Sequence, residues 1–360
     1  MSRVFISDCE GPISKNDNAF ELASHYIPRG DRFFTVISRY DDVLADVLKR
    51  RGYKAGDTLK LILPFLKAYG VTNNEMQSFS ARTLMLMPHS GEALQQVRRI
   101  TRAFIVSTSY EHYVRALCKA IDFPFHSTYC TRVDMDSYRL SLEEKQRLMK
   151  LADEIAVMPI IEIPAGACGL DDFPEKHRAA IRRLDEIFWN EIAQMEAGKI
   201  LREVNPVGGS EKAEAVKDIA RKLNVELADI IYVGDSITDA EAFRLVRAGG
   251  GLTLSFNGNR YAIRNAEVAV ISETGLVTAV IAELFMHLGK EETMNVLENW
   301  SWEALEKSPL SRITLEKLAA ACKKGLPKVK LVADENMDAL IQESEEFRKR
   351  VRGEAVGGLG

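Results

Sequence analysis

The chain opens with a short apolar run that ends in two acidic residues. Val4-Phe5-Ile6 is followed by Asp8 and Glu10, and the pair Gly11-Pro12 then interrupts regular structure. An apolar run of this length predicts a buried strand of a parallel sheet. Residues two apart on a strand point to the same side, and active sites of open α/β sheets lie at the carboxyl ends of strands. Asp8 and Glu10 are therefore candidates for one site, although solvated acids at a loop entrance would give the same pattern.

Two later apolar runs also end in polar residues and lead into predicted helices. The runs are Ala103-Phe104-Ile105-Val106 and Ile230-Ile231-Tyr232-Val233. The polar residues that follow them are Ser107, Thr108, Asp235 and Asp239. A hydroxyl-bearing turn between a strand and a helix suits a phosphate oxygen, but Ser and Thr are also ordinary helix N-caps. The second pair of acids adds to the first, because parallel strands end at one edge of a sheet.

Lys212 stands in the first turn of a helix that is predicted to run to Leu223. The helix dipole disfavours a cation at this position. A solvated lysine is the ordinary interpretation, and anionic neighbours are the alternative. Gly208-Gly209, just before the helix, permits close approach of the backbone.

Outside these strands the pattern is mainly helical. Apolar residues at three- and four-residue spacing predict helices at 19–25, 41–50, 58–69, 74–83, 142–157 and 175–197. We divide the chain into an α/β core at 1–12, 86–135 and 200–288, a helical cap at 13–85, a second helical insertion at 136–199 and a helical C-terminal extension at 289–360. The cap follows the two acids directly, so we expect it to fold over them. The second insertion and the extension fit either an added packing layer or the surface of a homodimer.

Composition excludes several classes of partner. The formal net charge of −4 provides no basic field for a nucleic acid. The five cysteines are scattered and form no CxxC pair, which predicts reduced thiols in a cytoplasmic protein. No signal peptide precedes the first strand, and Glu273 and Glu283 interrupt the most apolar later stretch, so we expect no membrane partner. Cys9 is expected to be a small buried residue that faces away from Asp8.

Taken in order, these features resemble the four motifs of the haloacid dehalogenase-like hydrolase superfamily. The motifs are strand–Asp8-x-Glu10, strand–Ser107, helix-start Lys212 and strand–Gly234-Asp235-x-x-x-Asp239. The resemblance covers roughly 1–12, 86–132 and 203–287. The cap resembles the lid of the phosphoserine phosphatase branch, in its archaeal type. It implies a Rossmann-like parallel sheet with a cap inserted after the first strand.

The resemblance also implies a role for each residue. Asp8 would be the nucleophile of a phosphatase and would form an aspartyl-phosphate. Mg²⁺ would be held by Asp8, Asp235 and the backbone carbonyl of Glu10, while Asp239 would either hold a metal-bound water or ligate the ion directly. The phosphoryl oxygens of a small phosphorylated metabolite would be bound by Ser107, Thr108 and Lys212.

Glu10 departs from the resemblance, because the superfamily usually has Asp at this position as general acid and base. The longer side chain adds one C–C bond of about 1.5 Å, and a misplacement of that size can cost on the order of a hundredfold in rate. The alternative is therefore a regulatory or complex-associated protein that binds metal or phosphate and turns over little. Three cap cations are candidates for an anionic leaving group, although each can equally be a solvated surface charge: Lys15, Arg32 and Arg39.

Overall fold

The structure, a computed structural model, describes residues 3–358. Its centre is a seven-stranded sheet in the order β3-β2-β1-β4-β5-β6-β7, parallel except for β7, which pairs antiparallel with β6. The strands are β1 (Val4–Ser7), β2 (Arg102–Tyr110), β3 (Thr128–Thr131), β4 (Ile230–Gly234), β5 (Leu252–Phe256), β6 (Val268–Ile271) and β7 (Lys328–Leu331). The predicted α/β class with a parallel sheet is confirmed.

Helices cover both faces of the sheet because alternate strand residues point to opposite sides. The core helices are α5 (Ser90–Ile100), α6 (Glu111–Ala120), α10 (Ser210–Leu223), α11 (Ala240–Ala248), α12 (Arg260–Asn265) and α13 (Leu276–Leu288). Phe5 and Val233 pack in the core of one face with helices such as α5 and α13, while Val4 and Tyr232 pack on the other face with α10 and α11. Among the described residues no helix is long and apolar enough to cross a membrane.

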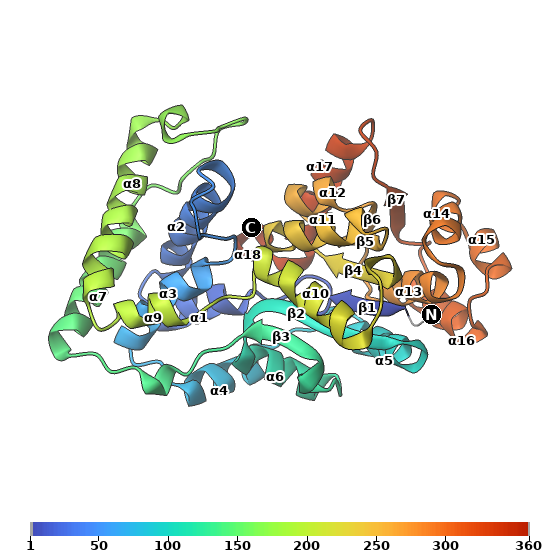
Figure 1. Cartoon of the computed structure of the whole chain (residues 1–360), viewed down its shortest axis with the longest axis horizontal. Helices are drawn as coiled ribbons and strands as arrows, with labels where there is room; N and C mark the ends of the chain where they lie inside the picture. Colours follow the sequence, from blue (N-terminus) through green and yellow to red (C-terminus); the bar gives the residue numbers. More distant parts are fainter. Residues whose placement is uncertain (1–2, 359–360) are drawn as a thin grey trace.

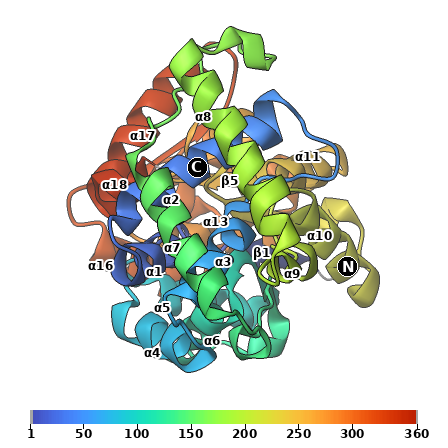
Figure 2. The same cartoon turned by 90° about the vertical axis from the view of Figure 1, so that its left-hand side faces the viewer.

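The two helical insertions form one body beside the sheet (Figure 1), and Figure 2 faces it. Phe33 and Phe65 of the first insertion share a hydrophobic core with Leu151 and Phe188 of the second. The second insertion is therefore not a separate layer but the outer half of the cap. The helices of this body are α1 (Asn18–Tyr26), α2 (Gly30–Asp42), α3 (Thr58–Ala68), α4 (Asn73–Thr83), α7 (Leu142–Val157), α8 (Glu175–Glu186) and α9 (Gly198–Glu203).

Two local predictions were wrong. The helix expected at 41–50 starts earlier, as α2 at Gly30, and continues as a π-helical turn to Val47. Phe33, Phe34 and Ile37 form the buried stripe of this helix, a helical spacing that the prediction did not use, and α2 begins directly at the Pro28-Arg29-Gly30 break. The turn expected after Val106 is also absent, because β2 continues to Tyr110 with an irregular register beyond Val106.

The C-terminal extension is not wholly helical, because it contributes β7 to the edge of the sheet. Its helices are α14 (Lys290–Glu298), α15 (Trp302–Lys307), α16 (Arg312–Ala321), α17 (Met337–Arg352) and α18 (Glu354–Gly357). The glycine-rich end forms α18 and lies between the sheet and the cap in Figure 1; residues 359 and 360 lie outside the described chain. The extension thus returns from the sheet edge to the cap.

Candidate active site

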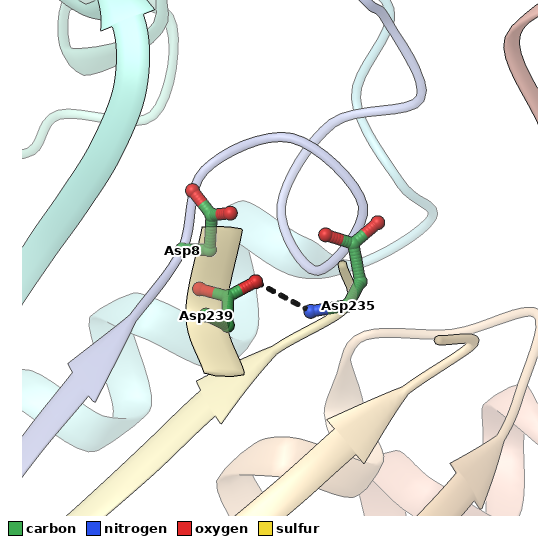
Figure 3. Close-up of side chains that lie close together, drawn as sticks. All are labelled: Asp8, Asp235 and Asp239. Atoms are coloured by element: carbon green, nitrogen blue, oxygen red, sulfur yellow. Dashed lines mark hydrogen bonds between the residues drawn. The ribbon is translucent and has the colours of Figure 1, made fainter. Parts of the chain in front are cut away.

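Three buried carboxylates converge at the carboxyl edge of the sheet. Asp8 follows β1 and Asp235 follows β4, and these two strands are neighbours. Asp239 lies one short turn beyond Asp235. A carboxylate oxygen from each of the three lies within 4.8 Å of the other two (Figure 3). Asp8 and Asp235 are 227 positions apart in the chain. They meet because the parallel strands that carry them end at the same edge of the sheet.

Backbone amides fix two of these carboxylates. Asp8 Oδ1 accepts a hydrogen bond from the Cys9 amide at 2.6 Å. Asp239 Oδ2 accepts from the amides of Asp235 at 3.0 Å and Ser236 at 3.1 Å. A Cβ on Gly234 would lie 2.4 Å from Asp239 Cγ, so only glycine fits beside this turn. Cys9 itself is buried in the hydrophobic core, as predicted.

Lys212 forms ion pairs with two of the three acids, Asp8 and Asp239. Its Nζ donates to Asp8 Oδ2 at 2.5 Å and to Asp239 Oδ1 at 2.7 Å, and its side chain is fully buried. Burial alone would lower the pKa of Lys212, but Asp239 and Asp8 outweigh it and raise that pKa. The lysine therefore stays charged. Its anionic neighbours explain why a cation stands at the start of a helix, where the helix dipole disfavours it.

Burial raises the pKa of Asp8 to about 7, with Asp239 and Asp235 adding to the effect and Lys212 opposing it. A carboxylate with a raised pKa among other acids is typical of a functional site. A bound cation would favour the ionised form of the whole cluster.

Glu10 lies at the entrance to the cap rather than in the carboxylate cluster. Its Oε1 accepts a hydrogen bond from the Asn18 amide at 2.7 Å, where α1 begins. Burial and the nearby Asp17 raise the pKa of Glu10 well above its ordinary range. Among the described residues, the side chains placed to share one ion are those of Asp8, Asp235 and Asp239. Any metal role of residue 10 therefore falls to its backbone carbonyl.

The two predicted phosphate-binding hydroxyls lie on β2, next to β1. Ser107 and Thr108 line the same cavity as Asp8. Ser107 Oγ accepts from the Ser109 amide at 3.2 Å. Thr108 Oγ1 is buried and has no hydrogen-bond partner in the described chain. An unpartnered buried hydroxyl is costly, so this group is available to a ligand.

Two arginines that the sequence analysis missed contact the site from α17. Arg348 Nη1 and Arg352 Nη1 both donate to Asp235 Oδ2, the second at 3.0 Å. Both side chains are almost completely buried and line the cavity. Their sequence signal was the spacing of four from Leu340 and Ser344, which are also buried. That spacing places all four residues on one helix face.

The cap cations proposed for a leaving group do not line this cavity. Arg32 donates to the carbonyls of Ala156 and Met158 and so joins the two halves of the cap. Arg39 pairs with Asp42 and with the carbonyl of Gly358. The cap presents carboxylates to the cavity instead, through Asp41 and Asp42.

The cavity between core and cap is small, about 100 Å³. Pockets for small molecules usually measure about 300–1,000 Å³. Gly56 of the cap lies against Thr108 and Gly208 of the core, and a Cβ on Gly208 would lie 2.3 Å from the Ala55 carbonyl. The cap therefore packs closely against the core beside this cavity.

Fold and site together define an α/β enzyme with a carboxylate centre at the carboxyl ends of parallel strands. Residues 106–283 match the family of haloacid dehalogenase-like hydrolases. These residues therefore resemble a haloacid dehalogenase-like hydrolase, and the chain is a hydrolase by class. Asp8, Glu10, Arg348 and Arg352 lie outside the matched residues, and the tertiary structure brings them to the matched part.

Among solved structures, the chain is similar to gene product AF1437 from Archaeoglobus fulgidus, with a TM-score of 0.81 and 29% identity over 100% of this chain and 99% of that one. Two structures of phosphoserine phosphatase have 11% identity. The apo form has a TM-score of 0.40 and covers 76% of this chain and 96% of its own; the phospho-aspartyl intermediate analogue has 0.41, 74% and 92%. No sequence among the curated proteins compared matches the chain.

Proposed function

We propose that the protein is a magnesium-dependent phosphomonoester hydrolase that forms an aspartyl-phosphate on Asp8 and acts on a small phosphorylated metabolite. The observation that carries this proposal is the carboxylate of Asp8, which shares one cluster with Asp235 and Asp239 and pairs with the buried Lys212. A nucleophilic carboxylate needs a cation and a phosphate-binding lysine beside it, and the site provides residues for both.

The residues fit Mg²⁺ in their donor chemistry. The cluster offers only carboxylate oxygens, and Mg²⁺ prefers oxygen ligands together with retained waters. Asp8 and Asp235 would hold the ion, with the carbonyl of Glu10, while Asp239 is already occupied by backbone amides, Tyr232 and Lys212. The bound ion would offset the negative charge of the phosphate and of the attacking carboxylate.

The chain's own residues account for the two steps. An Asp8 oxygen attacks phosphorus, the bond from phosphorus to the leaving oxygen breaks, and Glu10 donates a proton to that oxygen. A water then attacks the aspartyl-phosphate, its proton passes to Glu10, and inorganic phosphate and free Asp8 result. The raised pKa of Glu10 supports its starting as a protonated acid. Lys212 and the hydroxyls of Ser107 and Thr108 bind the phosphoryl oxygens.

The cap supplies the walls that would contact the leaving group. Phe34, Ser38 and Asp41 come from α2, and Leu59 comes from the first turn of α3. Closure of the cap would keep bulk water from the aspartyl-phosphate until the leaving group has departed.

The test is hydrolysis of a generic phosphate ester, p-nitrophenyl phosphate, followed by a panel of phosphorylated metabolites. We expect release of phosphate that requires Mg²⁺ and is abolished in Asp8→Asn, because an amide cannot form the acyl phosphate. Asp31→Asn, on the exposed first turn of α2, is the matched control and should keep wild-type turnover. Undiminished activity in Asp8→Asn would remove Asp8 as nucleophile, and no release across the panel would favour the regulatory alternative.

A further inference from the structure

We propose that Arg348 and Arg352 are positioning residues of the metal site, and that the C-terminal helix α17 is thereby part of the active site. This inference rests on the metal site of the proposed function and deepens it. The two arginines hold the Asp235 carboxylate through one oxygen and leave the other oxygen for the ion. The extension would then be required for metal binding rather than serve only as packing.

The contacts divide the two oxygens of Asp235 clearly. Oδ2 accepts from both arginines, and a Cβ on Gly11 would lie 2.1 Å from this same oxygen. Gly11 has φ +98°, a conformation that glycine adopts without strain. Oδ1 has no hydrogen bond in the described chain. One oxygen is therefore enclosed by donors and backbone, and the other is free to bind a metal.

Arg348 is itself fixed from several directions. Its Nη1 also lies within hydrogen-bond distance of the backbone carbonyls of Asp235 and Asn257, at 3.3 and 3.4 Å. One helical turn before Arg348, on the same buried face of α17, the Ser344 hydroxyl donates to the Gly258 carbonyl at 2.6 Å. The helix is thus anchored to the loop after β5 as well as to Asp235. Mutation of a residue that holds a ligating carboxylate in place commonly lowers metal affinity by about 10- to 100-fold.

Arg352 also ties the cap to the metal site. Its guanidinium donates to the carbonyls of Lys15 and Asn16, which belong to the linker between Pro12 and α1. Immediately beyond α18, the Gly358 carbonyl accepts from Arg39 of α2. The same C-terminal segment therefore contacts Asp235, the cap linker and a cap helix. This arrangement couples the position of the cap to the position of the ligand.

The experiment measures binding of Mg²⁺ alone to the full chain by isothermal titration calorimetry, with Mn²⁺ binding by electron paramagnetic resonance as a second readout. Arg348→Gln should weaken metal binding about 10- to 100-fold, and Arg348→Lys should recover part of the loss. Arg350→Gln is the matched control, because Arg350 lies on the exposed face of the same helix. Its affinity should remain within about twofold of wild type.

The sign of the change decides the proposal. Unchanged or tighter Mg²⁺ binding in Arg348→Gln would overturn it, because tighter binding would mean that the arginine competes with the ion. If that variant does not fold, Arg352→Gln keeps Arg348 in place and should still weaken binding about tenfold. Wild-type protein that binds no Mg²⁺ would instead refute the metal site of the proposed function.

A second readout separates positioning from simple packing. In Arg352→Gln, backbone amides of residues 13–18 should exchange hydrogen faster, because two carbonyls of that linker lose their donor. Arg350→Gln should leave this exchange unchanged. Equal exchange in wild type and Arg352→Gln would show that Arg352 does not hold the cap linker.

Discussion

Positive charge reaches the carboxylate cluster from two sides that are built differently. On one side Lys212 stands at the start of α10 and contacts Asp8 and Asp239. On the other side Arg348 and Arg352 project from the last turns of α17 and contact Asp235. Lys212 comes from α10, the helix that precedes β4 of the sheet. The two arginines come from α17, which follows the last strand, β7, in the chain.

The difference separates chemistry from placement. Lys212 contacts the proposed nucleophile, so its charge acts on the reacting atoms. The arginines contact one oxygen of Asp235 and the cap linker, so they act through other groups. Removing the lysine should reduce turnover at low and at saturating Mg²⁺ alike. The loss of turnover on removing an arginine should be partly restored by more Mg²⁺. The following predictions test that division, from the largest effect on turnover to the smallest.

Lys212→Met should have the largest effect. Loss of the charge that stabilises the phosphoryl oxygens should lower kcat by about 10²–10³-fold at saturating Mg²⁺. The change also leaves Asp8 and Asp239 buried without their cation, which should lower the free energy of unfolding by about 3–5 kcal/mol. Steady-state kinetics and chemical denaturation measure the two effects.

The control for this variant is Lys217→Met, on the exposed face of the same helix, where Lys217 pairs with Glu214. It should change the free energy of unfolding by less than about 0.5 kcal/mol. Full recovery of kcat in Lys212→Met at high Mg²⁺ would contradict the division, because it would give the lysine the role assigned to the arginines.

Glu10→Gln should have an intermediate effect, since Glu10 transfers protons but does not bind the ion through its side chain. The amide oxygen can still accept from the Asn18 amide, so the local structure should persist. We expect kcat to fall about 100-fold, while Mg²⁺ affinity stays within about threefold. Kinetics and calorimetry on the same preparation separate the two.

Glu143→Gln, on the exposed first turn of α7, serves as the control for this change. A kcat for Glu10→Gln equal to that of wild type would place proton transfer on another group. A parallel loss of Mg²⁺ affinity would mean that the carboxylate of Glu10, and not only its carbonyl, holds the ion.

Asp41→Asn should have the smallest effect on turnover, less than about threefold. Both oxygens of Asp41 are already bound within the cap, by the Tyr53 hydroxyl and the Gly56 amide. Its effect should appear in stability. Burial raises the pKa of Asp41 from 3.8 to about 7, with the Tyr53 hydrogen bond opposing and Asp57 adding to the shift.

Between these two pKa values the folded chain keeps this proton and the unfolded chain releases it. The contribution of Asp41 to the free energy of unfolding therefore falls as pH rises from about 4 to about 7, by at most about 1.4 kcal/mol per pH unit. The difference between wild type and Asp41→Asn, from denaturation at several pH values, should show this slope. A flat difference for Asp41→Asn would disprove the buried protonated acid.

Elements with a regular pattern and a clear boundary were predicted closely. The helix at 142–157 has the predicted bounds, and those predicted at 58–69 and 74–83 differ by one residue at one end. β7 was missed because its polar sequence Lys328-Val329-Lys330-Leu331 buries only Val329 well at a sheet edge. The start of α2 was missed because Arg29 adopts a left-handed conformation, with φ 55°, at a Pro-Gly break. β7 is held in place by its pairing with β6 rather than by a pattern in its own sequence.

The sequence by itself determined the residues of the lysine side and of the carboxylate cluster. Asp8, Lys212 and Asp235 each stand where an apolar strand ends or a helix begins, and parallel strands necessarily end at one edge. Only the tertiary structure decided that two helical insertions share a core and that α17 returns across the chain to Asp235. Its arginines lie within a charged helix, where every Lys and Arg has the same local pattern. Which of them becomes buried depends on how the helix packs, and packing depends on contacts that are more than 100 residues apart in the chain.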